Sequence, residues 1–307
     1  MQEKKILVIG SLNMDMAVNV PYIPAVGETI LGGDIMETPG GKGANQAYAA
    51  GMLGDRVTML GAVGNDESGK RMLESLGKAN VDLSNILVEK SVRTGMAVIL
   101  VNENGNNSIV VAPGANNLCD VAYLRTMQEK ISDCDILLLQ LEIPREAAYF
   151  AIEMAHALGK TVILNPAPAP DRIPSIILSK IDYITPNESE LRKLTGLPVN
   201  TREEVRAACE VLLEQGVKSV LVTLGGDGAL LASGGEFFYY PVKDVEVVDT
   251  TAAGDTFNAA VAVMLAEGKG MDDAVAFANQ AATITVQRKG AQASIPSREE
   301  VEQEGGF

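Results

Sequence analysis

The sequence predicts an α/β protein with three layers, in which a mostly parallel sheet carries helices on both faces, plus a small β-sheet lid. Short apolar segments alternate with helical patterns over most of the chain, which is typical of parallel sheets that are buried on both faces. Two β-rich stretches interrupt this alternation and predict the small sheet. A chain of 307 residues can bury one large core, so we expect a single domain over residues 1–307.

The composition excludes some classes of partner. Lys and Arg total 25 against 40 Asp and Glu, which gives a net charge of −15. Such a chain repels phosphate backbones and anionic membrane surfaces. The sequence has no Trp and only 7 Tyr and 6 Phe, so surfaces for stacking nucleic-acid bases are scarce. We therefore expect neither a nucleic acid nor a membrane as a partner.

The cysteines and the first residues indicate a cytoplasmic protein. Cys119, Cys134 and Cys209 are odd in number and lack metal-ligand spacing, so we expect small core residues. Met1–Lys5 is polar and runs directly into a strand, which does not fit a signal peptide. No apolar run approaches the length of a membrane helix.

The first predicted strand is Lys5–Gly10, a continuous apolar run. Asn13 and Asp15 follow it, so their side chains lie at the carboxyl end of a sheet strand, where α/β proteins bind ligands. A dinucleotide-binding fold would require the spacing Gly-x-Gly-x-x-Gly at this point, and the residues after Gly10 do not supply it. The interpretation of the chain as a dehydrogenase therefore loses its main support.

Two stretches alternate as short strands and predict a lid over the site. Met16–Met36 is broken repeatedly by Pro and Gly, while Thr94–Val101 and Ser108–Val111 are joined by the turn-rich segment Asn102–Asn107. We expect a separate sheet formed by about 15–39 and 93–112. The alternative is a pair of hairpins at the edge of the main sheet.

A glycine turn lies between these stretches. Pro39–Gly43 leads into an Ala-rich helix that ends near Leu53, and it contains Lys42 and, shortly after, Asn45, which can hydrogen-bond hydroxyl groups. The next expected elements are a strand over Arg56–Val63 and a helix over Glu67–Asn80.

From Asp133 onward, strands and helices alternate in the order expected of right-handed βαβ units. The predicted strands are Asp135–Glu142, Thr161–Asn165, Ile181–Thr185, Ser219–Thr223 and the hairpin Ala229–Leu231 with Glu236–Tyr240. The predicted helices are Arg145–Leu158, Glu188–Thr195, Arg202–Gln215, a helix from about 255 to 267, and Met271–Val286.

A second glycine turn occurs before the helix at 255–267. The apolar segment ends at Asp249, and Thr250–Gly254 consists of threonines and small residues. Small residues let backbone N–H groups approach a ligand, and a helix N-terminus favours an anion such as a phosphate. Asp255 falls in the first helical turn, where the anion would bind. The alternative is that Asp255 only caps the helix.

Polar residues follow several other strands and should share one edge of the sheet. They are Gln140, Glu142, Asn165, Asn187, Glu190 and the segment Thr223–Gly228. Together with the two glycine turns they predict a polyhydroxylated substrate beside an anionic one.

The segments Gly40–Asn45 and Asp249–Phe257 resemble the two signatures of the ribokinase-like carbohydrate kinases. The likeness extends from Ile6 to about Pro296, nearly the whole chain. It implies an ATP-dependent kinase that phosphorylates D-ribose at O5 to give D-ribose 5-phosphate and ADP, with Mg²⁺ and with K⁺ as a monovalent activator. It also implies a homodimer formed through the β lid.

The resemblance assigns the reacting groups. Asp255 would be the general base for the sugar hydroxyl, and the backbone N–H groups of Ala252, Ala253 and Gly254 would form an anion hole. Since a helix N-terminus stabilises a carboxylate, Asp255 should be a weak base, which is tolerable if proton transfer is late. The sugar-binding residues implied are Asn13, Asp15, Gly41, Lys42, Asn45, Glu142 and Asp255.

The resemblance also assigns cofactor sites. Asn187 and Glu190 would arrange Mg²⁺ and its waters, and the positions at the nucleotide would be Thr223, Gly225, Gly226, Gly228, Gly254 and Asn279. The potassium ion would lie among Asp249, Thr251, Thr285, Arg288, Gly290 and Ser294. The alternative for this last segment is a charged turn after a helix.

One position departs from the family pattern, in which many members carry Gly where this chain has Ala252. Alanine is harmless there if its φ stays negative. Two other functions stay open. The acceptor could be fructose or a nucleoside, as in fructokinase-like or adenosine-kinase-like enzymes, although the sugar-binding set is densely polar. The chain could instead be a sugar sensor that lost catalysis, against which an intact Asp255 argues.

Overall fold

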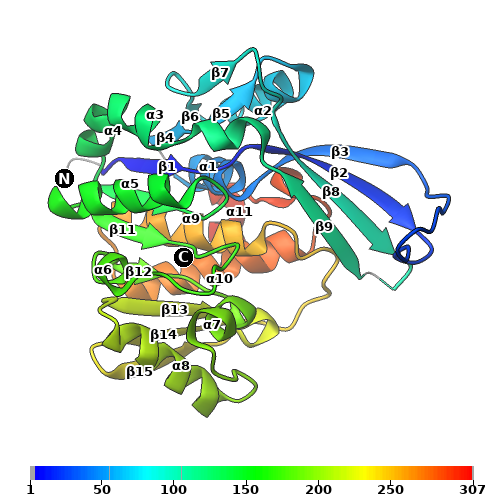
Figure 1. The fold of residues 1–307 in the computed structure, drawn as a ribbon. Helices are drawn as coiled ribbons and strands as arrows, with labels where there is room; N and C mark the ends of the chain where they lie inside the picture. The colour runs from blue at the N-terminus through cyan, green and yellow to red at the C-terminus, as the bar shows by residue number, and fades with distance from the viewer. Residues whose placement is uncertain (1–3, 55, 105, 306–307) are drawn as a thin grey trace.

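The computed structural model describes residues 4–54, 56–104 and 106–305. A main sheet runs through the molecule with helices on both faces, and a smaller sheet projects from one side (Figure 1). The predicted three-layer α/β fold with an additional small sheet is confirmed. Within the described ranges, none of the helices combines the length and the apolar character needed to cross a membrane.

The main sheet has nine strands in the described part of the chain, in the order β15-β14-β13-β12-β11-β10-β1-β4-β6. All neighbours from β6 to β13 are parallel, whereas β14 and β15 are antiparallel. The carboxyl ends of the parallel strands therefore share one edge. The strand bounds are β1 Ile6–Ile9, β4 Val57–Leu60, β6 Val81–Asp82, β10 Ile136–Leu139, β11 Thr161–Leu164, β12 Tyr183–Ile184, β13 Ser219–Thr223, β14 Ala229–Ser233 and β15 Glu236–Tyr240.

Strand β1 shows how the two helical layers are built. Its side chains alternate between the faces of the sheet. Ile6 and Val8 pack in the core with α1 (Lys42–Leu53), α9 (Ala253–Ala266) and α10 (Met271–Val286), while Leu7 and Ile9 pack in the core on the opposite face with α5 (Arg145–Ala157) and α8 (Arg202–Glu214). The remaining α-helices described are α2 Glu67–Gly77, α3 Val121–Thr126, α4 Gln128–Asp133, α6 Ser175–Leu178, α7 Glu188–Thr195 and α11 Arg298–Gly305.

The small sheet, here called the lid sheet, has the strand order β3-β2-β8-β9. It consists of β2 Asn13–Val20, β3 Ile35–Gly40, β8 Gly95–Asn102 and β9 Asn107–Ala112, with β2 and β8 parallel and the outer pairs antiparallel. It is separate from the main sheet, so the alternative of edge hairpins is wrong. The predicted turn between β8 and β9 includes Gly105, which lies outside the described residues.

Two predictions of elements need correction, and several short elements were not predicted. Residues 21–34 form no strand, because prolines there cannot donate to a ladder. The strand expected over Arg56–Val63 breaks at Gly61, where an added Cβ would lie 2.5 Å from Leu12 Cδ1. The chain continues as β5 (Ala62–Gly64), which pairs with β7 (Leu87–Glu89) in a separate two-stranded sheet. The helices α3, α4, α6 and α11 and the 3₁₀ turns Gly114–Leu118, Gly225–Asp227 and Gln292–Ser294 were not predicted.

Candidate active site

The two glycine turns lie together at the carboxyl edge of the main sheet. Helices α1 and α9 pack against one another, and side chains from the start of α1 bond Asp255 in the first turn of α9. Asn45 Nδ2 donates to Asp255 Oδ2 at 3.0 Å, and Gln46 Nε2 donates to Asp255 Oδ1 at 3.0 Å. Asp255 is only 7% exposed. Two segments some 210 residues apart in the chain thus form one site.

Burial dominates the electrostatics of Asp255. It raises the pKa of the carboxyl above its ordinary value, with a further contribution from Glu142, while Lys42 and the two hydrogen bonds from Gln46 and Asn45 oppose the increase. The expectation that the helix N-terminus makes Asp255 a weak base is therefore wrong in direction. The loss of water around a carboxylate outweighs the helix dipole here.

Lys42 lies among several carboxylates. Burial disfavours its charge, but Asp255, Glu142, Glu190 and Asp15 together raise the pKa of the ammonium. Lys42 thus stays cationic at the centre of the site and partly neutralises its neighbours.

Asp15, on lid strand β2, interacts with the same group of charged side chains. Burial, together with the charges of Glu142 and Asp255, raises the pKa of Asp15 to about 7, and Lys42 opposes this shift. Space around the carboxylate is limited, because a Cβ at Gly40 would lie 2.1 Å from Asp15 Oδ2. Asp15 is poised to change its charge near neutral pH.

Glu142 is held in place by the first strand connection. Ser11 Oγ donates to Glu142 Oε2 at 2.6 Å, and the backbone N–H of Lys42 donates to the same oxygen at 3.1 Å. Ser11 Oγ in turn accepts from Gly43 N at 3.3 Å. The end of β1, the loop after β10 and the start of α1 are therefore joined at this carboxylate.

Asn13 is oriented by a residue that was not predicted. Asn116 Nδ2 donates to Asn13 Oδ1 at 2.7 Å, and Leu12 N donates to Asn116 Oδ1 at 2.8 Å. Asn13 Oδ1 is thus an acceptor, which leaves its amino group to donate to a ligand. Gly95 permits this contact, because a Cβ there would lie 2.3 Å from both amides. Asn13 and Asn116 are 103 residues apart, so no local pattern reveals their contact.

In the α1 turn, one side chain favours a ligand hydroxyl group and one glycine allows a close approach of the backbone. Asn45 Oδ1 is buried and has no hydrogen-bond partner in the described residues. Buried amide oxygens are normally paired, so a ligand hydroxyl would complete this one. Gly41 has a φ of 86°, and a Cβ there would lie 2.7 Å from Asn13 N. A glycine is therefore needed where β2 and α1 approach.

The turn before α9 is conformationally strained at Ala252. Its φ is 62°, a left-handed conformation that L-residues other than glycine adopt with difficulty. The condition under which alanine would be harmless, a negative φ, is therefore not met. Ala252 O accepts from Thr256 N at 2.8 Å, and Ala253 N donates to Thr250 O at 3.3 Å, a long bond. The predicted anion hole lies at this turn, since the N–H groups in the first turn of a helix lack partners within the helix.

Asn187 and Glu190 form a capping box at the start of α7. Asn187 Oδ1 accepts from Glu190 N at 2.9 Å, and Glu190 Oε2 accepts from Asn187 N at 2.9 Å. Burial raises the pKa of Glu190, while Asn187 N and Lys42 oppose the increase. Among the described residues, no group of three or more Asp, Glu, His or Cys could hold a metal. A Mg²⁺ ion here would depend on phosphates and water for most of its ligands.

The predicted nucleotide residues meet around the ends of β13 and β15. Thr223 forms a parallel bridge with Asn187, and Gly225 and Gly226 form the 3₁₀ turn that follows. Gly228 has a φ of 91°, and a Cβ there would lie 2.0 Å from Tyr240 O. Asn279 Nδ2 donates to the same carbonyl at 2.9 Å. The strand ends thus lie beside α10.

Asp249 joins the two segments predicted to hold potassium. Its Oδ1 accepts from Thr251 N and Thr251 Oγ1, at 2.9 and 2.6 Å, and its Oδ2 accepts from Gly290 N at 2.9 Å. Burial would raise its pKa, but these hydrogen bonds lower it below the ordinary value. An ionised carboxylate therefore lies between the two segments.

The other residues of this set offer backbone oxygens. Thr285 Oγ1 donates to Ala281 O at 2.9 Å and lies 3.2 Å from Thr256 Oγ1, and Ser294 Oγ donates to Ala291 O. The guanidinium of Arg288 pairs with Glu300 at 2.7 Å. Since the side chains are already used, a cation would be bound by carbonyl oxygens and Asp249, a donor set that suits potassium.

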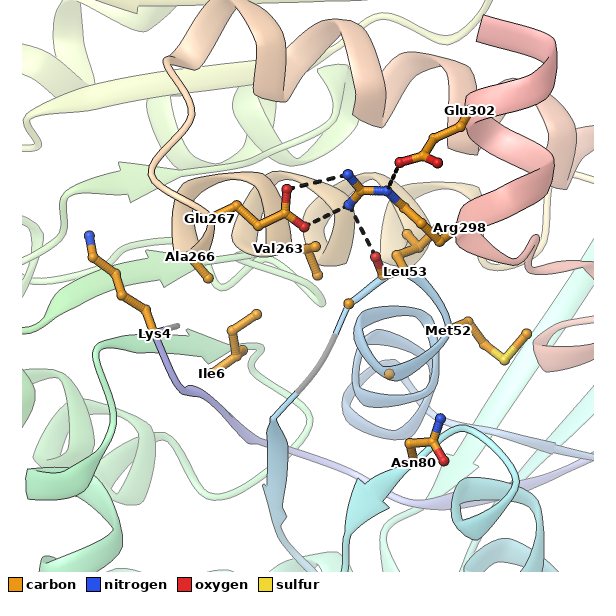
Figure 2. Close-up of a pocket in the computed structure, with 12 residues that line it drawn as sticks. Lys4, Ile6, Met52, Leu53, Asn80, Val263, Ala266, Glu267, Arg298 and Glu302 are labelled. Atoms are coloured by element: carbon orange, nitrogen blue, oxygen red, sulfur yellow. Dashed lines mark hydrogen bonds and ion pairs between the residues drawn. The ribbon is translucent and has the colours of Figure 1, made fainter. Parts of the chain in front are cut away.

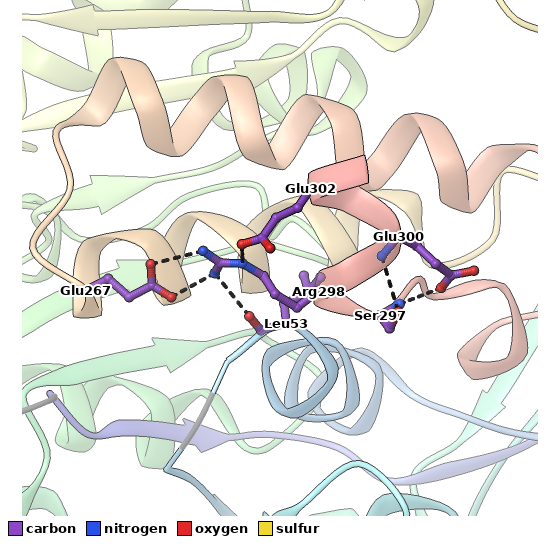
Figure 3. A network of polar contacts seen from close by, with 6 residues as sticks. All are labelled: Leu53, Glu267, Ser297, Arg298, Glu300 and Glu302. Atoms are coloured by element: carbon purple, nitrogen blue, oxygen red, sulfur yellow. Dashed lines mark hydrogen bonds and ion pairs between the residues drawn. The ribbon is translucent and has the colours of Figure 1, made fainter. Parts of the chain in front are cut away.

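A cavity of about 390 Å³ lies at the opposite edge of the sheet, beside the start of β1 (Figure 2). At its wall, Arg298 bonds Glu267, Glu302 and the backbone oxygen of Leu53 (Figure 3). None of the predicted site residues lines this cavity. It is the space beside a paired guanidinium, away from the chemistry.

Comparison with known proteins identifies the family. The model of the pfkB family carbohydrate kinases matches residues 3–298. Ribokinase from Haemophilus influenzae is 40% identical over 297 residues, covering 97% of each chain, and ribokinase from Schizosaccharomyces pombe is 43% identical over 309 residues, covering 97% of this chain and 96% of the other. The structure of Arabidopsis thaliana ribokinase complexed with ribose and ATP matches over the whole of both chains, with 36% identity and a TM-score of 0.90. The chain belongs to the pfkB family of carbohydrate kinases.

Proposed function

We propose that the protein transfers the γ-phosphoryl group of ATP to O5 of D-ribose, giving D-ribose 5-phosphate and ADP. The observation that carries the proposal is the position of Asp255, which is buried between a densely polar pocket and the turn that opens α9. Ribokinases that are 40% and 43% identical over nearly the whole chain support ribose as the acceptor, and the related structure with ribose and ATP supports both substrates.

In this proposal Asp255 takes the proton from the primary hydroxyl of the sugar. Its raised pKa suits that role, because a better base gains more from accepting a proton. The backbone N–H groups of Ala252, Ala253 and Gly254 stabilise the charge that develops on the transferring group. Lys42 limits the repulsion among the surrounding carboxylates.

The sugar would lie between the lid sheet and α1. Asn13 donates from its free amino group, Asn45 accepts at its unpaired Oδ1, and Asp15 and Glu142 accept from hydroxyl groups. Gly41 lets the backbone come close. A base-binding slot for a nucleoside would require apolar or aromatic walls, and this set is polar throughout.

The nucleotide would lie along Thr223, Gly225, Gly226, Gly228 and Asn279, next to Gly254 of the anion hole. When bound, Mg²⁺ would neutralise phosphate charge. Asn187 and Glu190 would hold waters around it with the side-chain atoms that their capping box does not use. Potassium would occupy the segment around Asp249, where it would stabilise the turn before α9. The residues that would hold it are Asp249, Thr251, Thr285, Arg288, Gly290 and Ser294.

We also propose a homodimer through the lid sheet. Large apolar side chains are exposed on it and on its connecting loop, namely Val26, Leu31, Ile35, Met36, Ile109 and Val110. Exposed strand edges and apolar patches favour a partner. Light scattering at micromolar concentration should show a dimer, and a monomer would contradict this part. A cytoplasmic location is supported by three buried free thiols.

The test is ADP release with MgATP and a panel of ribose, 2-deoxyribose, fructose and adenosine, each in K⁺ and in Na⁺. Strong turnover on ribose that falls in Na⁺ is expected. Preference for fructose or adenosine would replace the substrate and leave the family unchanged. Ribose binding without turnover on any acceptor would favour the sensor.

A further inference from the structure

A row of buried polar side chains lies behind Asp255, and only Asn165 among them was expected at this edge of the sheet. Gln46 comes from α1, Asn165 follows β11, Thr185 follows β12 and Asn258 lies in α9. All four are at most 7% exposed. Polar groups this deep are retained only where hydrogen bonds compensate for lost water.

Hydrogen bonds connect these side chains, with Gln46 as a donor on both sides. Gln46 Nε2 donates to Asp255 Oδ1 at 3.0 Å and to Asn165 Oδ1 at 3.3 Å. Asn165 Nδ2 donates to Thr185 O at 2.9 Å, and the hydroxyl of Thr185 donates to Asn258 Oδ1. Asn258 Nδ2 then donates to Gly254 O at 2.8 Å. The row begins at the Asp255 carboxylate and returns to the backbone residue immediately before it.

The orientation of Gln46 is fixed from its other side. Gln140 Nε2 donates to Gln46 Oε1 at 2.5 Å, so a flipped Gln46 amide would place two amino groups against each other and its oxygen against a carboxylate. Gln140 Oε1 lies close to Gly10, where an added Cβ would be 2.1 Å away, and it has no hydrogen-bond partner among the described residues. The Gln46 donor is thus directed at Asp255 before any ligand binds.

We infer that Gln46 and Asn258 are positioning residues at the two ends of this row, and that the row fixes the Asp255 carboxylate and the Gly254 peptide relative to each other. One network would then align the base with the anion hole. Such alignment matters because a displacement of about 1 Å can reduce a rate about 100-fold. The inference deepens the proposed function and rests on it.

The charged groups around Asp255 define what a Gln46 variant should do. Lys42 on α1 favours the carboxylate, whereas Glu142 after β10, Asp15 on β2 and Glu190 on α7 oppose it. Gln46→Met removes a hydrogen bond to the carboxylate and changes none of these charges. The pKa of Asp255 should therefore rise further, and the acid limb of the kcat profile should move to higher pH.

The experiment compares kcat, KM and pH profiles of wild type and Gln46→Met. We expect kcat at neutral pH to fall by about 10- to 100-fold, with a smaller change in the KM for ribose. The control is Ser219→Ala, which removes a partly buried hydrogen bond to Ser233 of 2.9 Å at the amino end of β13. The control should keep the wild-type profile. An unshifted acid limb in Gln46→Met would overturn the inference, even if kcat fell.

A double variant tests whether the row acts as a unit. Asn258→Ala should also lower kcat, and combining it with Gln46→Met should cost much less than the product of the two effects. If the loss of kcat in the double variant equalled the product of the two single losses, the two residues would act independently. That result would overturn the inference that the row acts as a unit. The carboxyl ¹³C titration of Asp255 in the ligand-free protein should show a higher pKa in Gln46→Met. This readout holds even if wild type proves inactive on ribose, so it separates failure of the row from failure of the proposed function.

Discussion

The two edges of the main sheet use charge in opposite ways. At the amino edge, Arg298 is saturated by Glu267, Glu302 and a backbone oxygen, and it stacks on Phe277. At the carboxyl edge, Lys42 faces more carboxylates than it can neutralise, and Asp255 is buried with a raised pKa. A cavity of about 390 Å³ nevertheless lies at the amino edge. Unbalanced buried charge therefore marks the site better than empty volume does.

The strongest test of this contrast is Asp255→Asn. It keeps the shape of the site and removes the base, so turnover should fall by roughly 10²- to 10⁴-fold while ribose binding persists. Burial disfavours the carboxylate, but the new amide would set its amino group against that of Asn45 or Gln46, so stability at neutral pH should stay close to that of wild type. Steady-state kinetics, sugar titration calorimetry and thermal denaturation measure the three quantities. Near-normal turnover would remove Asp255 from its role.

A second test uses the pH dependence of stability. The folded-state pKa of Asp15, about 7, exceeds its ordinary value of 3.8, so between these values the folded protein binds more protons than the unfolded chain. Its contribution to the free energy of unfolding therefore decreases as pH rises through this range. Asp15→Asn should lose less Tm than wild type between about pH 5 and pH 8, with a change of roughly 2–4 °C for each kcal/mol. Parallel Tm curves for the two proteins would contradict the assignment.

At the amino edge, Arg298→Gln should affect stability alone. The ion pairs are partly exposed, so together with lost packing on Phe277 the change should reduce the free energy of unfolding by about 1–2 kcal/mol. Urea denaturation measures it, and kcat and KM should stay at wild-type values. A fall in kcat without a fall in stability would show that the two edges are coupled.

The smallest expected effect is that of Ala252→Gly. Glycine relieves about 1–2 kcal/mol of left-handed strain, but its greater freedom in the unfolded chain offsets about 0.4–1 kcal/mol. We expect a net gain in stability of about 1 kcal/mol or less, measured by urea denaturation. A clear loss of stability would mean that the alanine methyl contributes packing that outweighs its φ of 62°.

Local patterns predicted most of the fold and the groups that face a ligand. Apolar runs located the strands, and glycine turns located Lys42 and Asp255. What the sequence could not show was the support behind them. Gln46 bonds Asp255 across 209 residues, and Asn116 bonds Asn13 across 103. A buried amide in an Ala-rich helix carries no periodic signal, and short helices such as α3 are fixed by tertiary packing. The sign of the Asp255 pKa shift likewise depended on burial, which a helix position alone does not give.

The contact between Asn116 and Leu12 has a mechanical consequence. It joins the residue just before β2, where the chain enters the lid sheet, to the turn after β9, where the chain leaves it. Any movement of the lid sheet relative to the main sheet would therefore pivot near this contact. Asn13 and Asp15 belong to the lid sheet, whereas Lys42, Glu142 and Asp255 lie on the elements around the main sheet. A sugar bound to both groups would hold the lid sheet against the main sheet. Its residence time would then depend on how often the lid sheet moves away.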